Sequence, residues 1–339
     1  MRPLRRAACL LAAALACGPA LAWGPDGHRT VGAIAEGLLA GTPVAAKLKP
    51  LLKGISLRDA ANWADCLRGF GPGPDFDYPD KGKHPACAPF ETDAGIAEMR
   101  DFVRRNDANC KRRPHEGPCH EAYHYTDVDP ALGRYDPQFT GTRDVDIVAA
   151  TGATLRVLQG HAAPAPFSIR GKREALLLLA HYVGDLHQPL HAGAVYLDAK
   201  GHLLHPRTGP APSGSSTVGG NDIIPVDAVT GHEMGKLHAM WDDVPAALLA
   251  GHLDDAWKAA ARAVPATAGD PATWPAAWAG ETIVAARQAF DGVRFQPREA
   301  GLWHATLPTG YRDRMTALKK TQLTRAGARL AQMLQAALK

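Results

Sequence analysis

The segment Leu176–Gly193, LLLLAHYVGDLHQPLHAG, constrains the fold most, because polar side chains interrupt a strongly apolar run. With its flank from residue 172 the run is too long for a strand and predicts a buried helix, which Pro189 ends. His181 and Asp185 are four residues apart and share one helix face, and His191 follows the break. Burying these groups is costly unless they are partnered. The segment therefore indicates either a site for zinc or a hydrogen-bonded His–Asp pair in the core.

The first 22 residues have a basic start, an apolar middle and a small-residue end, which is typical of a secretory signal peptide cleaved before Trp23. The apolar part is too short to span a bilayer, and no later stretch is long enough. We therefore expect an exported protein, periplasmic or secreted, with no stable membrane association.

The formal net charge of +4 applies to the full chain and overstates the charge of the mature chain. Arg2, Arg5 and Arg6 leave with it, so 35 basic residues face 34 acidic ones in the mature chain. This balance neither predicts nor excludes nucleic acid as a substrate, and phosphate binding would depend on local charge or metal ions.

Four cysteines remain in the mature chain, and an oxidising compartment predicts two disulfides among them. Three pairings are open. We favour the two local pairs, Cys66–Cys87 and Cys110–Cys119.

Helical periodicity dominates the mature chain, and strand signals are scarce. We predict an all-α fold with a single domain over residues 23–339. An insertion rich in Gly, Pro and Ser, residues 194–220, contains a short hairpin at 195–197 and 202–204, and residues 123–129 are expected to be extended. The predicted helices cover residues 29–40, 44–52, 57–69, 91–113, 143–159, 172–186, 234–249, 252–264, 276–292 and 308–338.

Further polar residues stand in apolar surroundings like those of the opening segment. His238 and Asp242 form a second pair four residues apart, Asp65 lies among small and apolar neighbours, His124 lies between two tyrosines, and His28 begins the first helix. Each alone is more often a satisfied core or surface group. Together they supply enough nitrogen and oxygen ligands for more than one zinc ion.

The other histidines carry no motif. His187 is expected either beside the ligands, without being one, or at the surface, because its spacing places it off the face of His181 and Asp185. The rest are expected at the surface: His84, His115, His120, His161, His202, His205, His232, His252 and His304.

Six motifs follow one another along the mature chain: Trp23-Gly-x3-His28, Trp63-Ala-Asp65-x2-Arg68, His124-Tyr-x-Asp127, His181-x3-Asp185-x2-Gln188-Pro-Leu-His191, Gly219-Gly-Asn221 and Leu237-His-x2-Trp241-Asp242. These motifs and their order resemble those of the zinc-dependent, single-strand-preferring nucleases, nuclease S-one and nuclease P-one. The resemblance runs from Trp23 to the last helix and implies the helical fold shared by zinc phospholipase C and these nucleases.

The resemblance implies three Zn2+ ions. One would be held by Asp65, His124, His181 and Asp185. Its neighbour would be held by the free amino group and carbonyl of Trp23, by His28 and by Asp185 as a bridge. The third would be held by His191, His238 and Asp242. Because an amide nitrogen has no lone pair for a metal, the uncleaved chain should lack the ion at Trp23.

The implied reaction is hydrolysis of single-stranded DNA and RNA, with 3′-nucleotidase activity. Hydroxide formed on zinc would attack phosphorus and leave 5′-phosphate products. Asp65 would orient the attacking water or accept its proton, and Arg68 and Asn221 would contact the phosphoryl oxygens. Alternatively, Arg68 is an ordinary surface residue and Gly219-Gly220 a plain turn.

Base recognition is implied for two residues next to His124. Tyr125 would stack on a base, and Asp127 would hydrogen-bond to it. Stacking requires an unstacked base and so favours single strands. Alternatively, Tyr125 packs against the core.

Two features depart from the fungal members of the family. Residues 195–218 form a long insertion, which is expected to line the cleft and alter the substrate range, and Cys66 has no counterpart among the fungal disulfides.

Two rival functions are considered. One is a zinc phospholipase C-type enzyme, in which Glu stands where this chain has Asp242. The other is a non-catalytic exported zinc-binding protein, in which Arg68 and Asn221 would have no purpose. We expect a monomer.

Overall fold

The structure is a computed structural model that describes residues 23–71, 75–108, 118–227 and 229–339. It is mainly helical, as predicted. The α-helices are α1 (Pro25–Leu39), α2 (Pro43–Leu52), α3 (Leu57–Ala60), α4 (Trp63–Cys66), α5 (Asp93–Asp107), α6 (Ile147–Leu158), α7 (Gly171–Leu186), α8 (Pro189–Ala192), α9 (Leu237–Asp242), α10 (Asp255–Arg262), α11 (Trp274–Phe290) and α12 (Tyr311–Ala337). Short 3-10 turns join them: η1 (Leu67–Gly69), η2 (Pro85–Phe90), η3 (Cys119–His124), η4 (Pro130–Leu132), η5 (Ala246–Leu248), η6 (Ala250–His252) and η7 (Pro271–Thr273).

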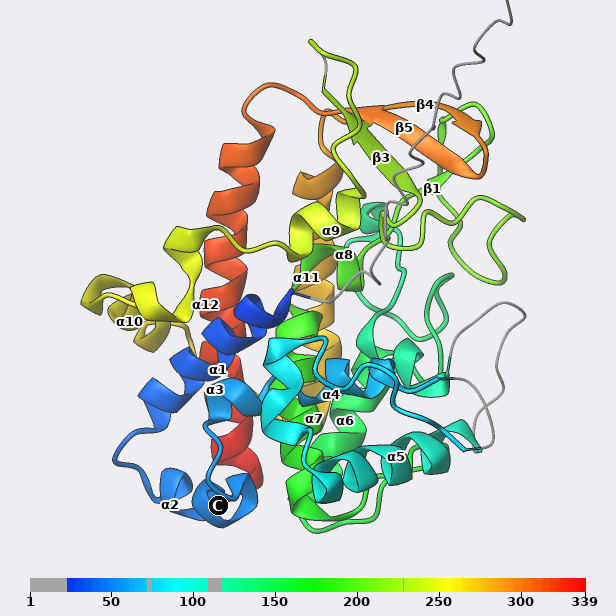
Figure 1. Ribbon diagram of the computed structural model, residues 1–339. Coiled ribbons are helices and arrows are strands. Elements are labelled where there is room, and N and C mark those ends of the chain that lie inside the picture. The colour runs from blue at the N-terminus through cyan, green and yellow to red at the C-terminus, as the bar shows by residue number, and fades with distance from the viewer. Residues whose placement is uncertain (1–22, 72–74, 109–117, 228) are drawn as a thin grey trace, which may run out of the picture.

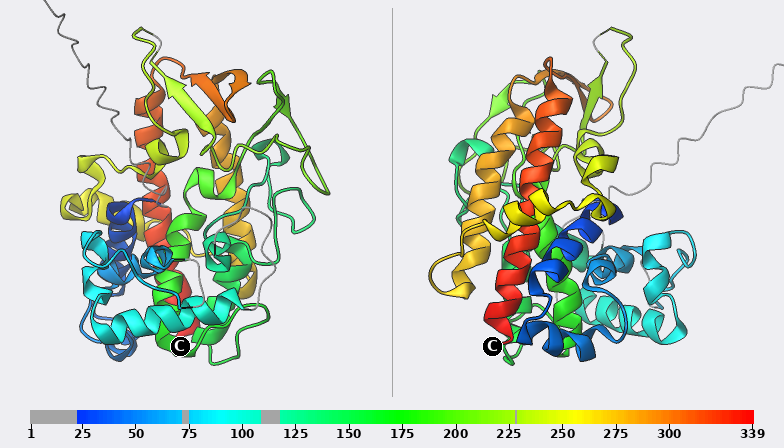
Figure 2. Two further views of the ribbon diagram at one scale, coloured as in Figure 1. Left: turned by 45° about the vertical axis from the view of Figure 1, so that its right-hand side comes forward. Right: turned by 90° about the vertical axis from the view of Figure 1, so that its left-hand side faces the viewer.

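Helix α7 is the centre of the fold. Every residue from Glu174 to Leu186 is buried, because α1, α6, α11 and α12 pack around it. Figure 1 shows α7 in green beside the long red helix α12, with α5 crossing below. The views in Figure 2 show α11 and α12 running side by side. Burying four consecutive leucines on this helix contributes on the order of 6–12 kcal/mol before chain entropy is subtracted.

Capping explains where several helices begin. Asp146 accepts hydrogen bonds from the backbone N–H groups of Val148 and Ala149, so α6 begins at Ile147 rather than at the predicted Arg143. Thr92 caps α5, and Ser56 caps α3. Helix α9 is shorter than the predicted 234–249, because the chain becomes extended at Asp243.

A small sheet was not predicted. Strand β3 (Ile223–Val226) pairs in parallel with β5 (Leu302–Thr306), which pairs antiparallel with β4 (Arg294–Glu299). The predicted hairpin in the insertion is confirmed as β1 (Tyr196–Leu197) and β2 (Leu203–Leu204). The start of the segment predicted to be extended, residues 123–124, instead ends the turn η3.

One predicted disulfide is confirmed, with Cys66 and Cys87 bonded. The other predicted pair includes Cys110, which lies outside the described residues, as do the predicted signal peptide and His115.

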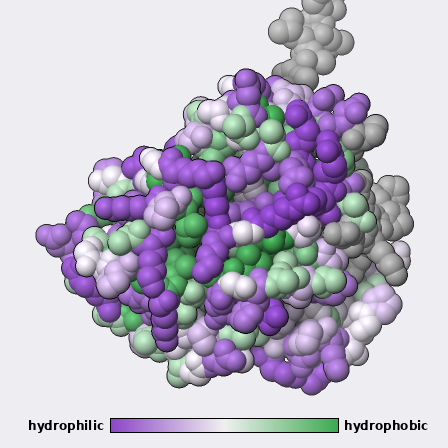
Figure 3. Space-filling view, turned by 90° about the horizontal axis from the view of Figure 1, so that it is seen from below, coloured by the Kyte–Doolittle hydropathy of each residue, from purple (hydrophilic) through white to green (hydrophobic). Residues whose placement is uncertain are grey.

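Over the described ranges, no helix combines the length and the apolar character that a membrane span requires. Seen from the end near α2 and α5, hydrophilic side chains border a narrow apolar strip (Figure 3).

Candidate metal centre

The side chains predicted as metal ligands gather from six separate elements. In the described part of the chain, three groups have ligand atoms within 4.8 Å of one another, and all their residues are buried. Helix α7 supplies two of these residues and thereby joins two of the groups. The groups are His28, His181 and Asp185; Asp65, His124 and His181; and His191, His238 and Asp242.

Asp185 lies between the first two groups. Its Oδ2 is 3.0 Å from His124 Nδ1 and 3.0 Å from His181 Nε2, while its Oδ1 is 3.2 Å from His28 Nε2. The rings of His28 and His181 stack, with centroids 3.7 Å apart. Asp65 Oδ1 stands 3.7 Å from His181 Nε2. One carboxylate is therefore positioned to bridge two cations.

The third group joins α8 to α9. His238 Nε2 is 3.1 Å from His191 Nε2 and 3.4 Å from Asp242 Oδ2. His191 Nε2 is 3.9 Å from Asp242 Oδ1. The group borders the first two, because His191 Nδ1 lies 3.9 Å from Asp185 Oδ2.

Backbone carbonyls fix the orientation of three imidazoles. The Nδ1 atoms of His181, His191 and His238 each donate a 2.7 Å hydrogen bond, to the carbonyls of Ala61, His124 and Gly219 respectively. With the proton held on Nδ1, each Nε2 presents a lone pair to its group. Such contacts are typical of histidines that bind metals.

Burial and neighbouring charges shift the acidity of these groups. Burial lowers the pKa of His28, and it lowers the pKa of His124 to about 4 and that of His238 to about 3, so these rings are neutral near pH 7. Burial also acts to lower the pKa of His181, but the carboxylates of Asp185 and Asp65 outweigh it and raise that pKa to about 9. Without a cation this ring therefore holds a proton near pH 7, and a metal that binds Nε2 must displace that proton. Against the effect of burial, the surrounding imidazoles hold the pKa of Asp185 well below its usual range.

The donor atoms fit divalent cations. Both carboxylate oxygens of Asp65 and Oδ2 of Asp242 are buried without a hydrogen-bond partner among the described residues. Leaving such atoms unsatisfied costs about 1–3 kcal/mol each. The close approach of His191 Nε2 and His238 Nε2 brings two lone pairs together, which is favourable only with a cation between them. Imidazole nitrogen and carboxylate oxygen are the donors that zinc takes in proteins.

Close packing sets the position of His28. A Cβ on Gly184 would lie 2.9 Å from Nδ1 of His28, so only glycine lets α7 approach α1 this closely. Trp23, two residues before α1, is fully buried, and its indole N–H donates to the carbonyl of Gly184. The next residue, Gly24, donates its backbone N–H to the carbonyl of Asp242. The chain at Trp23 is thus held between α7 and α9.

Two residues that hold other polar side chains of this region in place, Gln188 and Arg329, were not predicted. The side-chain amide of Gln188 donates to Asp242 Oδ1, and its own oxygen accepts from Leu190 N at the start of α8. Arg329 contacts His187 Nε2 at 3.0 Å. His187 is completely buried, so of its two predicted positions the one at the surface is excluded. His120 is also completely buried, and its predicted surface position is wrong. An amide at the end of a buried helix is the signal that would have indicated Gln188.

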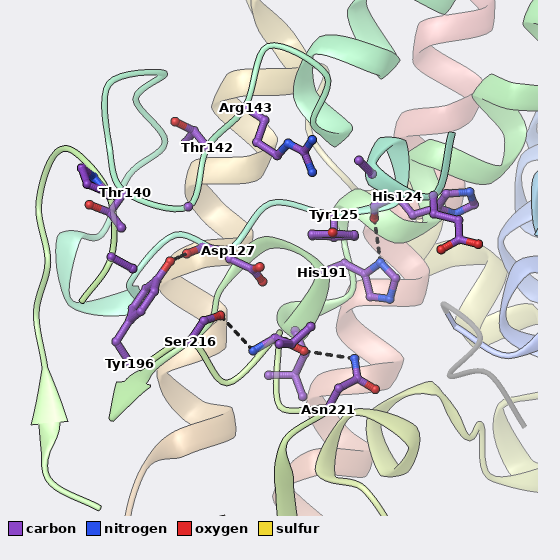
Figure 4. A pocket seen from close by; sticks show the side chains of 18 of the residues that line it. His124, Tyr125, Asp127, Thr140, Thr142, Arg143, His191, Tyr196, Ser216 and Asn221 are labelled. Carbon is purple, nitrogen blue, oxygen red and sulfur yellow. Dashed lines mark hydrogen bonds between the residues drawn. The ribbon is translucent and has the colours of Figure 1, made fainter. Parts of the chain in front are cut away.

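A cavity of about 1030 Å³ opens beside the centre. It is lined by His124, His191 and His238, and also by the residues predicted to bind substrate, Arg68, Tyr125, Asp127 and Asn221. Arg68 Nη1 stands 3.9 Å from Asp65 Oδ1. The amide nitrogen of Asn221 donates to the carbonyl of Val218 (Figure 4).

The insertion forms one wall of this cavity, as predicted. Residues 209–214 together with Tyr196, Ser216 and Val218 line it. The Tyr196 hydroxyl donates to the carbonyl of Asp127, and Thr140 donates its side-chain hydroxyl to the carbonyl of Gly209.

Comparison with known proteins gives a family and two relatives. The family model described as S1/P1 Nuclease matches residues 23–339. "Endonuclease 5" of Arabidopsis thaliana is 26% identical over 227 residues, which is 66% of this chain and 56% of that protein. "Endonuclease 4" of the same plant is 27% identical over 179 residues, 51% of this chain and 46% of that protein. The chain spans about half the length of these relatives.

Proposed function

We propose that this chain, which belongs to the S1/P1 nuclease family, is an exported zinc-dependent endonuclease. It would hydrolyse single-stranded DNA and RNA to 5′-phosphorylated products and would also act as a 3′-nucleotidase. The observation that carries the proposal is the convergence of three buried groups of potential ligands beside one cavity. We further propose a monomer, with residues 23–339 as a single domain and no stable membrane association.

Three Zn2+ ions would be held by the three groups. Asp65, His124, His181 and Asp185 would hold one ion, and His191, His238 and Asp242 would hold another. The remaining ion would be held by His28, Asp185 and the amino and carbonyl groups of Trp23. When bound, the ions would polarise the scissile phosphate and lower the pKa of water.

The chain's own residues would supply the rest of the chemistry. Oδ of Asp65 would accept the proton of the attacking water. Arg68, one turn from Asp65 and at the cavity wall, would offset charge on the phosphoryl oxygens. Asn221 would donate a hydrogen bond to the same group. Burial keeps the pKa values of His124 and His238 low, so at neutral pH no proton would compete with a cation for the donor nitrogens of these two rings.

Two residues would bind the base. Tyr125 lines the cavity beside His124, where a base could stack on its ring, a contact worth about 1–3 kcal/mol. Asp127, on the same wall, would accept hydrogen bonds from the base edge. A base inside this cavity must have left its helical stack, which favours single strands over duplex.

Substrate assays test the proposal. Purified protein is incubated with single-stranded DNA, RNA, 3′-AMP and phosphatidylcholine, with and without EDTA, followed by addition of zinc. We expect cleavage of the three nucleotide substrates, loss of activity with EDTA and recovery with zinc. Turnover of lipid alone would replace the proposal with a phospholipase C-type activity. Zinc binding without any turnover would indicate a non-catalytic zinc-binding protein.

Mass spectrometry of the mature protein tests the metal and export assignments together. We expect an N-terminus at Trp23 and three zinc ions per chain. A chain that keeps residues before Trp23 should bind one ion fewer, because its Trp23 nitrogen is an amide.

A further inference from the structure

The cavity contains a cationic side chain to which the proposed function gives no role. Among the described residues that line it, Arg68 and Arg143 are the two with a permanent positive charge. Arg68 stands beside Asp65 at the metal centre. Arg143 comes from another wall, the loop of residues 140–143, and in Figure 4 its guanidinium extends toward Tyr125, on the side opposite Asn221.

The loop that carries Arg143 is fixed to the wall with the predicted base-binding residues. The backbone N–H of Asp127 donates to the carbonyl of Gly141. Gly141 has φ +93, and a Cβ there would lie 2.0 Å from the carbonyl oxygen of Asp127. Only glycine tolerates this conformation and contact. The position of residue 143 relative to Asp127 is therefore set by backbone contacts.

Two further anchors hold the loop. Asp146, the N-cap of α6, accepts a hydrogen bond from the backbone N–H of Arg143 at 3.3 Å. On the other side, the backbone N–H of Thr140 donates to the carbonyl of Arg207 in the insertion. Because both ends of the loop are held through its backbone, replacing the Arg143 side chain should leave the loop in place.

We propose that Arg143 binds the phosphate of a neighbouring nucleotide in a polynucleotide strand, so that it serves polymeric substrates and not 3′-mononucleotides. The inference rests on the proposed function. A guanidinium matches two phosphate oxygens with paired hydrogen bonds. A volume of about 1030 Å³ is at the upper end for a small-molecule site, so the cavity has room beyond one nucleotide. The carboxylates of Glu121 and Asp127 line the same cavity, so a cation is needed there if an anionic strand is to bind.

Binding and turnover are measured separately to test this. The proteins are wild type, Arg143→Gln, Arg143→Lys and a control, Arg262→Gln, which removes an exposed arginine at the end of α10. Binding of a cleavage-resistant phosphorothioate oligonucleotide is followed by fluorescence anisotropy at several salt concentrations. Steady-state KM and kcat are measured on single-stranded DNA and on 3′-AMP, and thermal unfolding confirms that each variant is folded.

For Arg143→Gln we expect about a tenfold rise in Kd for the oligonucleotide and a similar rise in KM on single-stranded DNA. The plot of the logarithm of the binding constant against the logarithm of the salt concentration has a negative slope. This slope should become shallower by about 0.7, the value for one phosphate contact on a single strand. KM and kcat on 3′-AMP should not change. Arg143→Lys should restore the slope, because it restores the charge, while Arg262→Gln should match wild type.

Two results would overturn the inference. One is unchanged oligonucleotide binding by Arg143→Gln. The other is an equal loss of affinity for the oligonucleotide and for 3′-AMP. With an unchanged salt slope this result would place Arg143 at the base, and with a shallower slope it would place Arg143 at the scissile phosphate. If wild type binds the oligonucleotide but cleaves neither substrate, the proposed function fails, and the binding series still decides the role of Arg143.

Discussion

The side-chain amide of Gln188 donates a 2.7 Å hydrogen bond to Oδ1 of Asp242. This contact joins the break between α7 and α8 to α9, and both residues are buried. Because Gln188 also caps α8, which carries His191, one side chain orients two of the three residues of the third group.

Replacing Gln188 should therefore weaken metal binding without removing a ligand. For Gln188→Ala we expect the zinc affinity of the third group to fall by about 10- to 100-fold, the usual effect of losing a residue that orients a ligand. Competition with a chromophoric chelator measures it. Gln296→Ala, on the exposed strand β4, is the control. Equal affinities in the two variants would contradict a positioning role.

Asp185 offers the sharpest test of ligand sharing. Since its two oxygens face His28 on one side and His124 and His181 on the other, Asp185→Asn should deplete two ions rather than one. We expect metal analysis to find about one zinc per chain, at the third group, and nuclease activity to fall to background. The matched control, Asp255→Asn, alters an exposed carboxylate at the start of α10 and should keep the wild-type zinc content. Loss of a single ion from Asp185→Asn would show that Asp185 does not bridge.

Two helical glycines give a matched pair of stability variants. Gly184→Ala would place a Cβ 2.9 Å from His28 Nδ1, whereas Gly152→Ala in α6 meets nothing within 4 Å. We expect Gly184→Ala to lose about 1–3 kcal/mol of unfolding free energy through overpacking. Gly152→Ala should be unchanged or more stable by up to about 1 kcal/mol, from helix propensity. Urea unfolding with zinc present measures both, and similar values for the pair would exclude the close approach of α7 and α1.

The buried pair Glu174–Arg105, 2.7 Å apart, predicts a pH dependence of stability away from the metal centre. Burial raises the pKa of Glu174 from 4.5 to about 7, although Arg105 and the Arg170 backbone act to lower it. Between these values the native state holds a proton that the unfolded state has lost. Stability from this group therefore falls as pH rises through that window.

Glu174→Gln should remove this dependence, because an amide does not titrate. The free energy of unfolding of wild type relative to Glu174→Gln should decrease from pH 4.5 to pH 7, with a slope of at most about 1.4 kcal/mol per pH unit. Urea unfolding of both proteins at pH values below, within and above the window measures it. If the free energies of unfolding of the two proteins change in parallel with pH, Arg105 keeps Glu174 ionised over the whole window.

The sequence predicted the helices and most of the potential ligands because their signals are local. Spacing alone places His181 and Asp185 on one face of α7, and an apolar context alone marks that helix as buried. The resemblance to a known family added the order of motifs that groups ligands from six elements. No local spacing could do so, since His28 and Asp185 meet only in the folded chain.

What the sequence did not predict depends on contacts between distant segments. Strand β3 forms by pairing with β5, about 80 residues later, and neither segment has a strong strand pattern of its own. The burial of His120 likewise arises from packing, as its ring lies edge-on to Phe102 of α5. The position of Gln188 at the end of a buried helix indicates a polar partner, but the sequence does not identify that partner, Asp242, which approaches only in the folded chain.

The wall built by residues 195–218 has a consequence for how members of this family could diverge. Hydrogen bonds join it to Thr140, to the carbonyl of Asp127, to Asn221 and, through Gly214, to Arg298 on β4, and none of these is a predicted zinc ligand. Under the proposed function, the predicted zinc ligands and most of the wall that would select the substrate thus lie in separate stretches of the sequence, and Asn221 stands where the two meet. Related enzymes could exchange or resize this stretch and acquire new preferences while inheriting an intact hydrolytic apparatus.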